Sequence, residues 1–121
     1  MQKLIRTILF IFSLVGLFTS SESFADQSPD CSGPEQWPTS MAFVKLNNAG
    51  IADNNKLDFS KTKTIRLASE KLKDNLYRQV HLITFVEKSG KTIKVITIND
   101  ASNEECSMSG VDIYVVGKIL K

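Results

Sequence analysis

Histidine, cysteine and tryptophan are scarce in this 121-residue chain, which has one His, two Cys and one Trp. A single His leaves no second imidazole for a metal site or for an acid–base pair. The chain also has no large excess of charge of either sign, because 15 Lys and Arg residues are nearly balanced by 13 Asp and Glu residues. Beyond residue 25 the only arginines are Arg66 and Arg78, and a nearly neutral, arginine-poor chain does not suit nucleic-acid binding. We therefore expect no metal, no cofactor and no nucleic-acid partner.

The first residues of the chain have the pattern of a secretory signal peptide. Lys3 and Arg6 give a positive start, and the uncharged run Thr7–Phe18 that follows is shorter than the roughly 20 residues that a membrane-spanning helix needs. The stretch ends in small residues up to Ala25. We predict that residues 1–25 are cleaved after export, with an uncleaved anchor as the alternative.

What remains, residues 26–121, has the length and the ordinary composition of one folded domain. We expect it to be periplasmic or secreted, with no stable membrane insertion after cleavage of the signal. Residues 26–38 contain all three prolines of the chain and predict an irregular N-terminal arm.

The two cysteines, Cys31 and Cys106, predict one structural disulfide, since an exported protein meets an oxidising compartment. A metal pair or a free nucleophile is disfavoured, because there is no Cys-x-x-Cys motif and the only histidine, His81, is far from both cysteines in sequence. The bond would pin the arm to the polar loop at residues 99–110.

A short helix is expected from Met41 to Ala49, with Thr39 or Ser40 as its N-cap and Gly50 at its end. After the helix the apolar residues alternate with polar ones, which is typical of β-strands. The expected strands are Lys63–Leu72, Leu76–Glu87, Lys91–Asn99 and Val111–Leu120. The sequence thus predicts an α+β fold: one N-terminal helix packed on a four-stranded antiparallel meander, with one disulfide.

A two-residue turn at Ser89 and Gly90 would fix the pairing of the central hairpin. It pairs Val86 with Ile93, Thr84 with Val95 and Leu82 with Thr97, and we expect this apolar face to meet the helix. Six residues then fall on the opposite face as one patch: Tyr77, His81, Ile83, Phe85, Ile98 and Tyr114. This patch is either a binding surface or the site that the arm covers. Trp37 is either a cover for the core or an exposed anchor.

The favoured function is a small exported binding protein, an inhibitor or immunity-type protein that blocks another protein. We expect no enzyme, since no catalytic constellation is visible. One alternative is a small secreted hydrolase that uses His81 together with Tyr77 or an acidic loop residue. Another is a subunit of a surface assembly, for which an exposed strand edge would be the sign.

Overall fold

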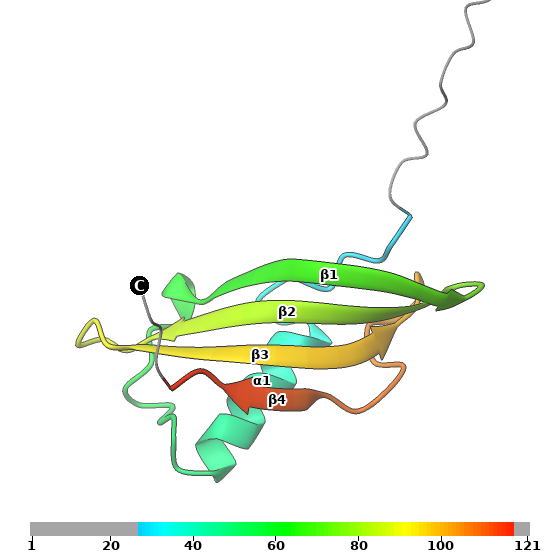
Figure 1. Ribbon diagram of the computed structural model, residues 1–121. Helices are drawn as coiled ribbons and strands as arrows, with labels where there is room; N and C mark the ends of the chain where they lie inside the picture. The colour runs from blue at the N-terminus through cyan, green and yellow to red at the C-terminus, as the bar shows by residue number, and fades with distance from the viewer. Residues whose placement is uncertain (1–26, 118–121) are drawn as a thin grey trace, which may run out of the picture.

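The computed structural model describes residues 27–117, so the predicted signal peptide lies outside the described residues. One helix and four strands make up the fold, joined by a short 3-10 helix, η1 (Figure 1). Their bounds are α1 Trp37–Asn48, η1 Phe59–Lys61, β1 Lys63–Lys73, β2 Leu76–Val86, β3 Thr92–Ala101 and β4 Asp112–Val115. The sheet is antiparallel in the order β1-β2-β3-β4, which confirms the predicted α+β meander.

Helix α1 starts earlier than predicted, at Trp37. Pro38 occupies its first turn, where the missing N–H is not needed, and the extended Gln36 precedes it without a side-chain cap. Thr39 and Ser40 therefore lie inside the helix, and their predicted role as N-cap is wrong. The irregular arm accordingly ends at Gln36.

The end of α1 agrees with the sequence pattern. Gly50 has a φ of +71°, a left-handed conformation that glycine adopts without a Cβ clash, and its N–H donates to the carbonyl of Asn47 at 3.1 Å. The last predicted strand is also found, but β4 is short, and residues 118–121 lie outside the described part of the chain. No helix within residues 27–117 is long and apolar enough to cross a membrane.

The register of the β2–β3 hairpin differs by one residue from the predicted one. Phe85 pairs with Ile93, and the N–H of Glu87 donates to the carbonyl of Lys91 at 2.7 Å, so the loop holds three residues, not two. Gly90, with a φ of +94°, takes the left-handed position that a three-residue hairpin loop requires.

This shift turns β2 over relative to the prediction, because a slip of one residue moves every side chain of a strand to the other face. Ile83 and Phe85 are buried against α1, whereas Leu82 lies on the opposite face and pairs with Ile96. The expected pairs of Val86 with Ile93, Thr84 with Val95 and Leu82 with Thr97 are therefore wrong. On β3 the inward residues are those that were expected.

The face of the sheet that meets α1 has an aliphatic half and a polar half. Helix α1 crosses behind the sheet and packs on the aliphatic half (Figure 1). The core there consists of Ala42, Leu46, Ala52, Leu57, Ile83, Phe85, Ile93 and Val95. Gln79, His81, Thr97 and Asn99 form the polar half, and all four are buried.

The N-terminal arm covers the polar half. The carbonyl of Pro29 accepts hydrogen bonds from Gln79 Nε2 at 2.8 Å and from Arg66 Nη1 at 3.2 Å. Cys31 is fully buried and bonded to Cys106, with 5.8 Å between their Cα atoms, which confirms the predicted disulfide. The bond links the arm to the loop between β3 and β4, as the sequence led us to expect.

The observed register predicts which truncations in β2 destabilise the fold. Ile83→Ala removes a fully buried side chain and should cost about 2–5 kcal/mol in the free energy of unfolding. Leu82→Ala truncates the preceding residue, whose side chain lies on the face of the sheet opposite α1, and this change should cost less than half of that. Urea unfolding of the two variants measures both losses, and the reverse order would support the register with Val86 opposite Ile93.

Candidate functional site

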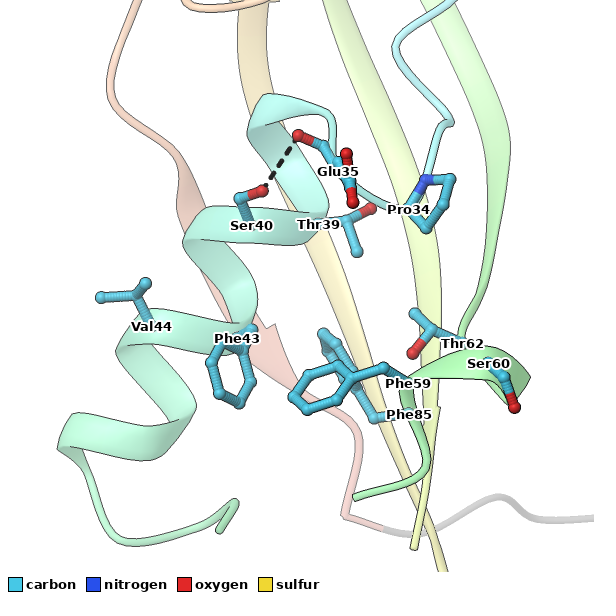
Figure 2. A pocket seen from close by; sticks show the side chains of 10 residues that line it. All are labelled: Pro34, Glu35, Thr39, Ser40, Phe43, Val44, Phe59, Ser60, Thr62 and Phe85. Atoms are coloured by element: carbon cyan, nitrogen blue, oxygen red, sulfur yellow. Dashed lines mark hydrogen bonds between the residues drawn. The ribbon is translucent and has the colours of Figure 1, made fainter. Parts of the chain in front are cut away.

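A pocket of about 480 Å³ lies between the first half of α1 and the segment that enters β1 (Figure 2). Its volume falls within the range typical of ligand pockets. Phe85, on the inner face of β2, forms the floor and is almost completely buried. The sides are formed by α1 and by η1, so that three segments distant in sequence meet at this site.

Two phenylalanines form the apolar wall of the pocket. Phe43 on α1 and Phe59 on η1 pack edge to face, with ring centroids 5.0 Å apart and an angle of 82° between the rings. Asp58 fixes the start of η1, because its carboxylate accepts a hydrogen bond from the N–H of Ser60 at 3.2 Å. Phe59 remains 45% exposed, so its ring is available at the mouth of the pocket.

The rim of the pocket is polar. Thr39, Ser40, Ser60 and Thr62 are among the lining residues. Thr39 is buried and its hydroxyl pairs with that of Thr64 at 2.8 Å, and Ser40 Oγ donates to the carbonyl of Glu35 at 3.1 Å. Among the lining residues only Glu35 carries a charge. An apolar wall with a carboxylate on the rim suits an apolar group that ends in a hydrogen-bond donor or a positive charge.

Few local features of the sequence indicate this pocket. Phe43 stands beside the predicted buried face of the helix, and Phe59 lies in a stretch without periodicity. An aromatic residue next to Asp58-x-Ser60, which form an Asx-type turn, is the one local signal. That signal does not reveal that two segments 16 positions apart come together.

The predicted six-residue patch is divided between the two faces of the sheet. Tyr77, His81, Ile83 and Phe85 lie on the inner face and are buried under α1 and the arm. Ile98 and Tyr114 lie on the open face, where Tyr114 is 57% exposed. The expectation of one contiguous patch is therefore wrong, and the reason is the three-residue loop that turns β2 over.

His81 is fully buried, and neither ring nitrogen has a hydrogen-bond partner among residues 27–117. Burial lowers the pKa of His81 below its ordinary value, and the nearby guanidinium of Arg66 lowers this pKa further. The carboxylate of Asp30 on the arm acts in the opposite direction with a smaller effect. The imidazole is consequently neutral at pH 7 and has no open path to solvent.

Trp37 combines both of the roles considered for it. Its side chain is half-buried, and its Nε1 donates to the carbonyl of Ser109 at 3.0 Å. The indole thus links the start of α1 to the loop that contains Cys106. Within residues 27–117 no cluster of His, Cys, Asp and Glu is arranged to hold a metal ion.

Comparison of the chain with protein-family models, with curated proteins and with solved structures gave no match.

Burial of His81 predicts a pH dependence of stability. In the unfolded chain the imidazole titrates near its ordinary pKa of about 6.5, so below that pH the unfolded state binds more protons than the folded state. The free energy of unfolding should be constant above about pH 7.5 and fall as the pH decreases through 6.5, by up to about 1.4 kcal/mol per pH unit.

Urea unfolding at several pH values between about 7.5 and 5.5 measures this slope. His81→Gln removes the only imidazole of the chain and should flatten the curve in this range, whatever its effect on absolute stability. Equal slopes in the wild type and the variant would contradict a buried, neutral His81.

Proposed function

We propose that this chain is a small exported binding protein that blocks another protein, and that the pocket between α1 and η1 receives a side chain of that partner. The observation that carries the proposal is the pocket wall itself, where Phe59 is 45% exposed and lies against Phe43. Aromatic groups in a small depression with a polar rim are typical of the residues that carry most of the energy in protein interfaces.

The chemistry of the pocket narrows the class of partner residue. A volume of about 480 Å³ accommodates one large apolar side chain and part of its neighbours. Glu35 on the rim favours a Lys or Arg near that side chain. We infer that the partner presents an aromatic or aliphatic residue next to a basic one.

The disulfide supports a role outside the cytoplasm. Cys31–Cys106 has a sequence separation of 75 residues and joins the arm to the loop between β3 and β4. Such bonds persist in oxidising compartments and stabilise small domains, by about 4–5 kcal/mol for a loop of this length in the chain-entropy model. A stapled scaffold also keeps Glu35, which is close in sequence to Cys31, in place on the rim of the pocket.

The alternatives receive less support from the geometry. A hydrolase would need a solvent-accessible imidazole, but His81 is fully buried, and Tyr77 on the same face of β2 is 7% exposed. An assembly through strand edges would need a regular open edge. The β1 edge is interrupted by bulges between Arg66 and Ala68 and between Lys71 and Lys73, which are features that discourage edge-to-edge pairing.

The proposal is tested by comparing how strongly two variants of this protein, used as baits, bind a captured partner. Phe59→Ser removes an aromatic ring from the pocket, whereas Met108→Ser removes an apolar side chain of equal exposure, 45%, that is not part of the pocket lining. A partner captured from the exported proteins of the source cell should bind the Phe59→Ser protein at least about tenfold more weakly, a difference of about 1.4 kcal/mol.

The Met108→Ser protein should bind that partner like the wild type. If the two variants bind equally, whether both retain or both lose affinity, the pocket is not the recognition site. Far-UV circular dichroism and the unfolding midpoint of each variant verify that the fold is retained.

A further inference from the structure

The face of the sheet opposite α1 is apolar in its centre. In Figure 1 it faces the viewer, and no described segment of the chain lies in front of it. Antiparallel sheets with one face in water normally carry polar residues on that face. Here the central residues are Ile65, Val80, Leu82, Ile96, Ile98 and Tyr114.

These residues form adjacent rows across the strands. Ile65, Leu82, Ile96 and Tyr114 are paired from β1 to β4 and make one complete row. Ile65 is 43% and Tyr114 57% exposed at its two ends. The next row continues from Ala68 through Val80 and Ile98 to Asp112. We call these two rows, with the charged rows on either side of them, the open face.

The two ends of the open face carry opposite charge. At the end near the β2–β3 hairpin, Lys63 and Lys94 flank Thr84 in one row. At the other end, Glu70, Arg78 and Asp100 form a row, with Asp112 beside them on β4. Lys73, which pairs with Leu76, adds a positive charge beyond this row. Arg78 pairs with Asp100 at 3.0 Å, and the three carboxylates against two cations leave this end with a net negative charge.

We propose that the open face joins two copies of this chain, related by a two-fold axis that runs across the strands in the plane of the interface. This rotation reverses the strand direction and places the lysine end of one copy on the carboxylate end of the other. Lys63 then faces Glu70 of the second copy, and Lys94 faces Asp100. The rotation about the strand direction would instead place lysine against lysine, so charge selects the first arrangement.

The apolar rows match in the same arrangement. The row of Ile65, Leu82, Ile96 and Tyr114 lies on the row that begins at Ala68. At the β1 edge, the large side chain of Ile65 thereby lies against the small side chain of Ala68 of the other copy. Sheets pack face to face at about 10 Å with such interdigitated side chains. Tyr114, at the β4 edge, lies over Asp112 of the other copy, within reach of a hydrogen bond from its hydroxyl.

The area of the open face is adequate for a dimer. Strands of the length of β2 extend about 36 Å, and four strands side by side span about 19 Å. With the short β4 taken into account, the flat area is roughly 600 Å² per copy, or about 1,200 Å² for two copies, the lower limit of specific interfaces. A standard interface buries about 800 Å² of each partner.

The dimer leaves the pocket accessible, because the pocket lies on the α1 side of the sheet and the interface on the other side. Each dimer would present two pockets on its outer surfaces. The inference thus goes beyond the proposed function and does not depend on it.

A charge-reversal pair of variants tests both the face and the arrangement. The variant Lys63→Glu/Lys94→Glu is negative at both ends of the open face, and Glu70→Lys/Asp112→Lys is positive at both ends, with the Arg78–Asp100 pair intact. Sedimentation velocity of the protein with its disulfide intact should show a concentration-dependent wild-type dimer. Each variant alone should dimerise at least about tenfold more weakly, because like charges then face each other.

An equimolar mixture of the two variants should recover a dimer that contains one copy of each, identified by its mass in native mass spectrometry. A wild type that stays monomeric at its highest soluble concentration overturns the proposal. So do variants that dimerise as the wild type does, or a mixture that stays monomeric while both variants are folded.

Ile65→Glu provides a second test that is independent of the charged rows. It places a carboxylate in the apolar row of the interface, at the β1 edge, and should weaken the dimer at least about tenfold. Ile51→Glu is the matched control, because Ile51 is exposed to a similar extent, 47% against 43%, outside the open face. Equal dimerisation of the two variants would also overturn the proposal. The binding experiment with the Phe59→Ser protein tests the pocket independently of all these measurements of dimerisation.

Discussion

The hairpin loop Lys88–Gly90 determines which half of the side chains of β2 becomes core. Both faces of this strand are largely apolar: Tyr77, Ile83 and Phe85 lie on one, Val80 and Leu82 on the other. Hydrophobic patterning alone therefore does not determine which face of β2 is buried. The register of the hairpin determines it. Gly90 accepts a φ of +94° and closes a three-residue loop, after which Phe85 lies opposite Ile93. The core under α1, the floor of the pocket and the composition of the open face all follow from this pairing.

A consequence of that register is that polar residues are buried while aliphatic ones face outward. Gln79, His81, Thr97 and Asn99 contribute less hydrophobic stabilisation than the aliphatic half does, and the burial of their polar groups costs free energy unless hydrogen bonds replace those to water. The arm supplies one such partner, the carbonyl of Pro29, to Gln79, and Asn99 Nδ2 donates to the carbonyl of Cys106 at 2.8 Å. The disulfide joins the two segments that make these hydrogen bonds. The position of the disulfide is thus explained by the polar half of this sheet face, because α1 packs on the aliphatic half.

The elements of the fold were predictable from local signals, and the site was not. Gly50 marks the end of α1, and the alternation of β3 identifies its buried residues, because each depends on residues close in sequence. The face of β2 depends on one extra loop residue, and Ser89-Gly90 fits both a two-residue and a three-residue loop. The pocket depends on the meeting of Phe43 and Phe59, which no local pattern encodes. Prediction therefore failed where a single long-range choice of register or contact decides the outcome.

The two surfaces that the register creates differ in the kind of recognition they suit. The pocket is small and concave with a single carboxylate on its rim, so it discriminates by the shape and charge of one side chain. The open face is broad and has opposite charge at its ends, a pattern that a two-fold rotation matches with itself. Because the sheet lies between the pocket and the open face, occupation of one surface does not obstruct the other. A dimer with two outward pockets would gain affinity for a partner that displays the recognised residue twice, through effective concentration and without any new contact.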